Sequence, residues 1–145
     1  MAKLSKTFLL IGGILAILLL VTFLALSAVF IALGSPMTTE VIRQLLEEGS
    51  INSDLPGTIE EQIAAIQIIF VSIGVVFACF IPFEIASIIV AFKGRKSFTK
   101  GLLTANIVFG ILSASSFNIA GGIIGLIANA RIERNNRNSN VVDAQ

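Results

Sequence analysis

Long runs of apolar residues are the dominant pattern along this chain. Residues 8–33 and 63–92 form two such runs, in which Glu84 is the only side chain that carries a full charge in water. About 20 apolar residues are enough to cross the ~30 Å hydrocarbon core of a bilayer as a helix. The pattern therefore predicts membrane spans over about 8–33 and 62–92.

Composition supports a membrane setting. Hydrophobic residues make up 55% of the 145 residues and charged residues only 13%, whereas soluble domains carry roughly 25% charged residues. A signal peptide is an alternative for the first run, because Lys3 and Lys6 precede it and 32-ALG-34 resembles a cleavage site. Since the run greatly exceeds the ~7–15 residues of a signal core, we favour an anchored span.

A third apolar block, residues 101–130, contains no charge. Its segment 113-SASSFN-118 has small and polar residues that favour a turn, so we expect two short spans, over 101–114 and 117–131. Each would be only ~22 Å long, so the pair must thin the bilayer locally, borrow length from 97-SFTK-100 or stop short as a re-entrant hairpin. One straight helix of ~45 Å stays open as an alternative.

The distribution of charge predicts the orientation. Of the ten Lys and Arg residues, all except Arg43 lie near the N-terminus, in the loop 93–100 or from residue 131 onward. The loop 34–61 is instead rich in Asp and Glu. Basic residues accumulate on the cytoplasmic side, which places both termini, the loop 93–100 and the tail 132–145 inside, and the loop 34–61 outside. We expect the polar tail to be flexible.

The outer loop contains helix signals of its own. Ser35 can cap a helix that has Pro36 at its first position, and Gly49 suits its end. Thr58 and Glu61 match a capping box at the start of the second span. Apolar side chains recur on one face of the expected outer helix, at Val41, Ile42, Leu45 and Leu46.

Glu84 is the main candidate for a functional residue. A charge at mid-membrane costs ~2.5–3.5 kcal/mol on insertion scales, whereas a protonated acid can donate a hydrogen bond. Ser87 lies one turn along the same helix face and Asn106 is expected at a similar depth, while Pro82 predicts a bend near 78–82. Glu84 is either a proton or cation site or one end of an interhelical hydrogen bond to Asn106, and we favour the hydrogen bond.

Small residues at a spacing of four allow helices in lipid to approach closely. Gly121 with Gly125 is such a pair. Weaker ones are Gly74 with Ala78, Gly12 with Ala16 and Gly110 with Ala114. We interpret them as packing sites within one chain rather than as a dimer interface.

Other chemistry has little support. There is no histidine and only one cysteine, Cys79, so common zinc sites, His-dependent triads and an internal disulfide cannot form. We expect no cofactor, no metal and no enzymatic activity. The formal net charge of +1 and the dispersed basic residues do not favour nucleic-acid binding.

The order of features resembles a family of small, uncharacterised four-span membrane proteins of Gram-positive bacteria, known as a domain of unknown function. The matching segments are 11-IGGILAI-17, the acidic outer loop, 93-KGRK-96, 107-IVFGILS-113 and 119-IAGGIIGLIANARI-132. The resemblance implies a membrane location and assigns no activity or catalytic residue.

Together these features predict an all-α, four-span bundle in a bacterial cell membrane, forming a single domain. We expect an accessory component of the envelope that contacts lipid and other membrane proteins or copies of itself. The alternatives are a proton- or cation-coupled transporter or channel subunit that uses Glu84, and a hole-forming lysis protein. Small multidrug transporters are similar in having four spans and one membrane glutamate, but theirs lies in the first span.

Overall fold

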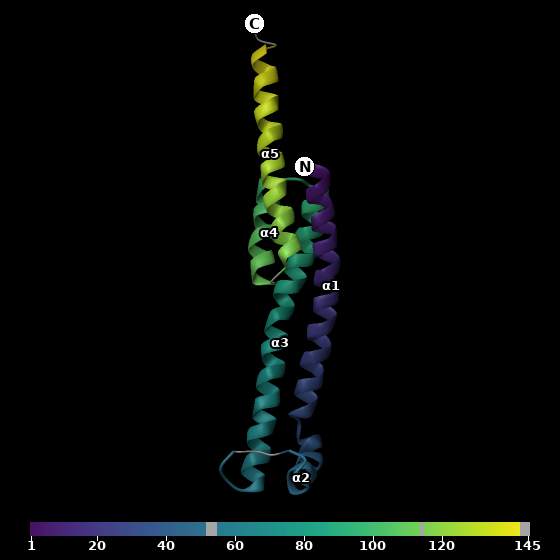
Figure 1. Cartoon of the computed structure of the whole chain (residues 1–145), viewed down its shortest axis with the longest axis vertical. Helices are drawn as coiled ribbons and strands as arrows, with labels where there is room; N and C mark the ends of the chain where they lie inside the picture. The colour runs from purple at the N-terminus through teal and green to yellow at the C-terminus, as the bar shows by residue number, and fades with distance from the viewer. Residues whose placement is uncertain (52–54, 114, 143–145) are drawn as a thin grey trace. The chain divides into compact units, whose positions relative to one another are not determined.

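The computed structural model describes residues 1–51, 55–113 and 115–142, with side chains to residue 136, and this part of the chain is helical apart from short turns. The all-α prediction is confirmed. Two of its helices, α1 and α3, are long and apolar enough to cross a membrane, and α4 is a shorter apolar helix. The elements are α1 (Ala2–Leu33), the 3-10 helix η1 (Pro36–Thr38), α2 (Thr39–Glu47), α3 (Ile59–Lys96), α4 (Lys100–Leu112) and α5 (Ser116–Val142) (Figure 1).

Residue contacts divide the chain into two compact units. The first unit consists of Met1–Leu20 and Pro82–Gln145, and so holds the start of α1, the end of α3, α4 and α5. The second unit, Val21–Ile81, holds the rest of α1, η1, α2 and the start of α3. Pro82 lies inside α3 without ending it, and the bend predicted at 78–82 stays a prediction.

In the second unit, α1 and α3 are joined by a series of aromatic contacts. The ring centroid of Phe30 lies 6.1 Å from that of Phe70 and 5.9 Å from that of Phe77. Phe23 continues the series, 5.9 Å from Phe77 and 5.6 Å from Phe80. Such aromatic pairs contribute about 0.5–1.5 kcal/mol beyond the area they bury, so these rings stabilise the packing of the two helices.

Glycines bring the same two helices close together. A Cβ atom on Gly74 would lie 3.1 Å from the backbone oxygen of Ser27, and one on Gly34 would lie 2.7 Å from the backbone oxygen of Gln67. The predicted packing residue Gly74 is therefore at a point where α3 meets α1. Its predicted partner Ala78 is half-buried.

The outer helix is present as η1 followed by α2, with Ile42 buried on its apolar face. Gly49 has a φ of +69° beyond the end of α2, a conformation that glycine adopts without strain. The predicted cap is wrong in detail, because the Ser35 side chain makes no capping hydrogen bond. Instead, the Ser35 carbonyl accepts a hydrogen bond from the Thr38 hydroxyl at 2.8 Å.

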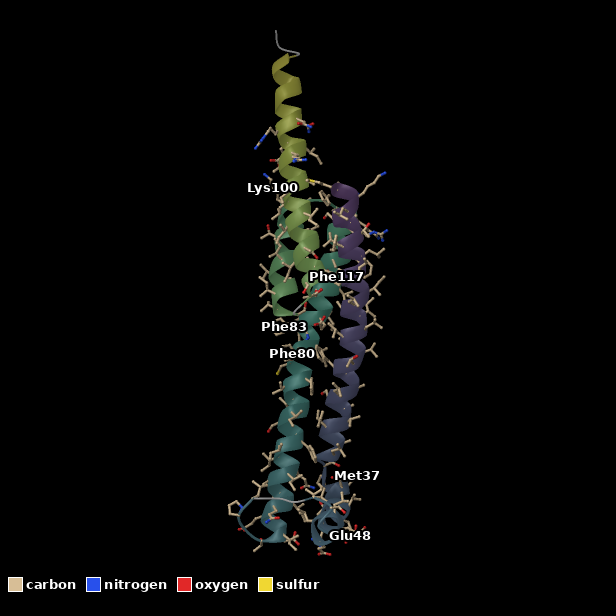
Figure 2. The ribbon with its side chains drawn as sticks, in the orientation of Figure 1. Met37, Glu48, Phe80, Phe83, Lys100 and Phe117 are labelled. Carbon is tan, nitrogen blue, oxygen red and sulfur yellow. The ribbon has the colours of Figure 1, made fainter. Side chains whose placement is uncertain are left out.

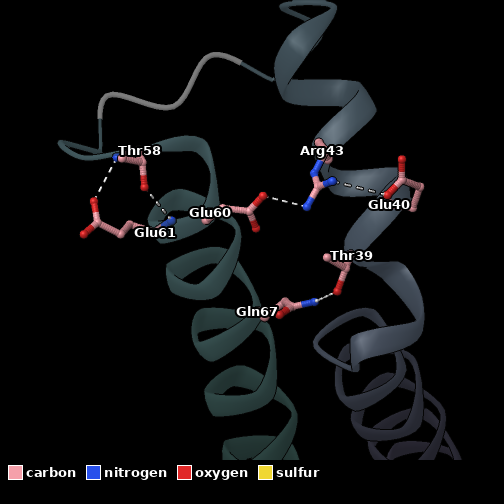
Figure 3. A network of polar contacts seen from close by, with 7 residues as sticks. All are labelled: Thr39, Glu40, Arg43, Thr58, Glu60, Glu61 and Gln67. Carbon is pink, nitrogen blue, oxygen red and sulfur yellow. Dashed lines mark hydrogen bonds and ion pairs between the residues drawn. The ribbon is translucent and has the colours of Figure 1, made fainter.

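Polar contacts attach α2 to the start of α3 (Figure 3). The predicted capping box is confirmed, since the Thr58 backbone nitrogen donates to Glu61 Oε2 at 2.8 Å and the Glu61 nitrogen donates to Thr58 Oγ1 at 3.4 Å. Arg43 pairs with Glu60 at 2.6 Å. Deeper along α3, Gln67 Nε2 donates to Thr39 Oγ1 at 2.9 Å.

In the first unit, the third apolar block forms a hairpin of α4 and α5, side by side in Figure 1. The single-helix alternative is therefore wrong. The chain turns after Leu112, where the Ser115 backbone nitrogen donates to the Gly110 carbonyl at 2.7 Å. A Cβ atom on Gly122 would lie 2.7 Å from the backbone oxygen of Leu103, so the two helix backbones are nearly in contact.

The start of α1 packs against α5 at the Gly121–Gly125 motif. The Ser5 hydroxyl donates to the Gly121 carbonyl at 2.7 Å. A Cβ atom on Gly121 would lie 3.1 Å from the Leu9 backbone nitrogen, and one on Gly125 would lie 2.8 Å from Ser5 Oγ. Both glycines therefore make contacts within the chain.

The polar tail differs from its prediction. The sequence predicts a flexible segment after residue 131, but α5 continues to Val142. Residues 143–145, at the end of this tail, lie outside the described residues. Neither Gly nor Pro, which most disfavour helix, occurs after Gly125. In addition, Glu133 pairs with Lys100 of α4 at 2.8 Å.

The close approach of α4 and α5 can be tested with Gly122→Ala. We expect a loss of ~1–3 kcal/mol in unfolding free energy, because the added methyl group overpacks the contact with the Leu103 backbone. Gly101→Ala is the matched control, since a Cβ atom there meets nothing within 4 Å. The measurement is the loss of helical circular dichroism on titration with denaturing detergent. Equal stabilities of the two variants would contradict the packing described.

Candidate functional site

The first unit has an unusual interior, because most of the side chains buried in it are polar. Leu9 and Leu103 are the large hydrophobic side chains that are fully buried there. In a membrane protein, buried polar side chains join helices through hydrogen bonds because lipid offers them no partner. The buried polar residues of this unit are Ser5, Glu84, Ser87, Asn106, Ser113, Ser115 and Asn118.

A chain of hydrogen bonds through Ser87 links α3, α4 and α5. Asn118 Nδ2 donates to Ser87 Oγ at 2.7 Å, and Ser87 Oγ lies 3.2 Å from Ser113 Oγ. The Ser113 hydroxyl is also 2.8 Å from the Phe109 carbonyl. A hydroxyl has one proton to donate, so if Ser113 donates to this carbonyl, Ser87 donates to Ser113. The resulting chain runs from Asn118 through both serines to the α4 backbone.

Glu84 lies one helical turn from Ser87 and is fully buried. Among the described residues, neither of its carboxyl oxygens has a hydrogen-bond partner. Ser115 Oγ and Asn118 Oδ1 are likewise buried, with no hydrogen-bond partner in the described part of the chain. We call Glu84, Ser87, Ser113, Ser115 and Asn118 the buried oxygen cluster.

An ionised Glu84 adds two acceptor oxygens and no donor to the buried oxygen cluster. A buried polar atom without a partner costs about 1–3 kcal/mol, and more if it is charged. A proton on Glu84 would turn one of its oxygens into a donor, and a bound cation would neutralise the carboxylate. Either species would satisfy the Glu84 carboxyl group, whose two oxygens have no donor among the described residues.

The predicted hydrogen bond between Glu84 and Asn106 is wrong. Asn106 Nδ2 donates to the backbone carbonyls of Val90 at 3.0 Å and Leu102 at 2.8 Å. Asn106 therefore joins α4 to the α3 backbone six residues beyond Glu84, about 9 Å along the helix.

The predicted Glu84–Asn106 pair is wrong because the two residues lie at different heights along the antiparallel helices α3 and α4. α3 and α4 are antiparallel around the short turn at residues 97–99, so residues equally far from that turn lie at the same level. Asn106 is thus level with Val90, whereas Glu84 is level with the end of α4. Counting from the turn would have identified Ser113 and the polar residues at the start of α5, among them Asn118, as close in level to Glu84.

Gly12 of α1 completes the wall beside Asn118. A side chain at this position would occupy the place of the Asn118 carboxamide, so a residue without a Cβ atom is required there. Sequence reasoning treated Gly12 only as a weak packing motif with Ala16, which is fully buried. Ala114, the partner expected for Gly110, lies outside the described residues.

Other reactive or metal-binding side chains are few in the described part of the chain. Cys79 is an exposed free thiol. No group of three or more His, Cys, Asp or Glu side chains close enough to hold a metal occurs among the described residues. The buried oxygen cluster is therefore the candidate site.

Comparisons of this sequence with protein-family models, curated proteins and solved structures find no match. The resemblance to a four-span family stays a prediction. Interpretation of the site therefore depends on its own geometry.

The link between α3 and α5 can be tested with a double-mutant cycle. We expect Ser87→Ala and Asn118→Ala each to destabilise the fold by ~1–3 kcal/mol, because each leaves a buried polar atom without its partner. The two effects should be non-additive by about 1 kcal/mol, as measured by detergent unfolding. Asn129→Ala on the same helix is the control and should be additive with Ser87→Ala. Additivity of Ser87→Ala with Asn118→Ala would show that the two residues do not interact.

Proposed function

We propose that this chain is a four-span integral protein of a bacterial cell membrane that acts by contacting lipid and other membrane proteins. The supporting observation is that its most apolar helices are exposed, the reverse of what is found in a soluble protein. The most apolar windows of α1 and α3 are only 11% buried, whereas a core helix of a soluble protein would be mostly buried. Large apolar side chains face outward along both helices, as Figure 2 illustrates, and include Leu18, Val21, Ile68 and Val76.

The packing of α1 supports an anchored span over a cleaved signal peptide. Ser5 and Leu9 lie against Gly121 of α5, and both residues would be lost with a cleaved segment. Removal of α1 would also uncover Asn118, which lies beside Gly12. The first unit therefore needs α1 to keep its polar interior covered.

Charge supports the orientation with both termini inside. The basic residues at the start of α1 and at the end of α3 lie in one unit with the basic part of α5, as the positive-inside rule favours. The acidic segment that contains α2 is then external. The hairpin is shorter than the ~30 Å hydrocarbon core of a bilayer, because α4 has 13 residues and a length of ~20 Å.

An accessory role agrees with the form of the outer surface. Exposed apolar side chains on α1 and α3 can be covered by lipid tails, by another membrane protein or by a second copy. We therefore infer that binding within the membrane, and contact through the external α2, is how the protein acts.

Single cysteines in a Cys79→Ala background test the topology. With a membrane-impermeant maleimide on intact cells, we expect labelling at Ser50→Cys and none at Ser97→Cys or Asn136→Cys until the membrane is opened, because the last two lie in cytoplasmic segments. Ser116→Cys reports on the hairpin turn, and labelling from outside shows that α4 and α5 cross. Outside labelling at Asn136→Cys would contradict the four-span arrangement.

A proton or cation site is the second candidate function. The observation that favours it is that Glu84 is fully buried with both carboxyl oxygens unpartnered among the described residues. Ionisable residues inside membrane spans often lie on ion or proton pathways. Here, the Ser87 and Asn118 contacts hold polar groups one helical turn from the carboxyl group.

Flux into liposomes separates the two candidates. The second predicts proton or alkali-cation uptake down an imposed gradient by the wild type and its loss in Glu84→Gln, because an amide cannot exchange a proton. Glu47→Gln, an exposed residue of α2, is the matched control and should keep the wild-type rate. Absence of flux from folded wild-type protein supports the accessory role and rejects the second candidate.

A further inference from the structure

The first unit has two adjacent hollows between α1 and α3. One, of about 480 Å³, is lined by Lys6, Phe92, Arg95 and Lys96. The other, of about 310 Å³, is lined by Lys3, Lys6, Thr7, Leu10 and Arg95. Lys6 and Arg95 thus line both hollows, and each hollow has one further cation of its own.

None of these cations has an anionic partner among the residues that the structure describes. Among the described residues, neither lining contains Asp or Glu, and the ion pair found in this unit joins Lys100 to Glu133 instead. Lys6 Nζ lies 5.9 Å from the ring centroid of Phe98, a cation–π contact that leaves its hydrogen-bond donors available. Four exposed cations held near one another favour an anion between them.

The linings indicate what kind of anion fits. Arg and Lys are the usual ligands of phosphate groups, which they bind through charge-assisted hydrogen bonds. Phe92 and Leu10 add apolar surface beside the cations. Phosphate joined to apolar groups describes a phospholipid rather than a free ion, and basic pockets between membrane helices are known to accept such headgroups.

We propose that the two hollows bind an anionic phospholipid whose headgroup carries two phosphates, one in each hollow. Lys6 and Arg95 form the shared wall between the phosphates, Lys96 binds the first and Lys3 the second. A lipid with one phosphate leaves the separate cation of one hollow without a partner. The identification of a lipid depends on the proposed membrane location, which puts these hollows at the cytoplasmic headgroup level.

Native mass spectrometry of the full chain in detergent measures the binding directly. We titrate diphosphatidylglycerol and, separately, phosphatidylglycerol and phosphatidylcholine, and we expect one copy of diphosphatidylglycerol to bind at least about tenfold more tightly than one copy of either other lipid. Lys6→Gln combined with Arg95→Gln should abolish this preference. Lys93→Gln combined with Arg134→Gln removes the same charge from exposed positions outside the hollows and should retain it.

Three outcomes would overturn the proposal. They are equal affinities for the two anionic lipids, an equal loss of preference in both double variants, and displacement of the lipid by inorganic phosphate at the same concentration, which would assign the hollows to a free anion. Circular dichroism of each variant confirms that it is folded. Because the titration needs no bilayer, it can fail while the cysteine labelling supports the four-span topology, and the reverse also holds.

Discussion

Close approach of helix backbones at glycine is the constraint on which the rest of this structure depends. Helices with apolar exteriors gain little from the hydrophobic effect in lipid, so van der Waals contact and buried hydrogen bonds must hold them together. Gly121 and Gly122 bring α5 against α1 and α4. At these separations short polar side chains can reach the next backbone, as Ser5 does with the Gly121 carbonyl.

The two units use this constraint differently. In the second unit, Gly74 and Gly34 set the distance and phenylalanine rings fill the space between α1 and α3. In the first unit, the interior is filled by serine, asparagine and Glu84. A polar interior specifies one register more strictly than rings do, because each donor must meet its acceptor. It also leaves oxygen atoms that can serve a function.

Much of the fold could be predicted from sequence because it follows from local signals. The capping box of Thr58 and Glu61, the turn before α5 and the outer helix all have short-range causes. The site could not be predicted in the same way. Asn106 and Asn118 are both asparagines within apolar segments. Which of them lies near Ser87 depends on how far each is along the antiparallel helices, counted from the turn at 97–99. The helical tail was missed because polar composition was given more weight than the absence of helix breakers.

The unpartnered oxygens of the buried oxygen cluster bear on both candidate functions in the same way. A carboxylate with no donor is unfavourable in an apolar interior whether the protein is an accessory component or a transporter, so protonation of Glu84 or a nearby cation would be favourable in either case. The two functions differ only in whether this positive species can leave. A structural role needs the proton to stay on Glu84 and complete the hydrogen bonding of α3 with the hairpin. Transport needs a path along which the positive species exchanges. The hydrogen bonds among Asn118, Ser87 and Ser113 include a residue one helical turn from Glu84, namely Ser87.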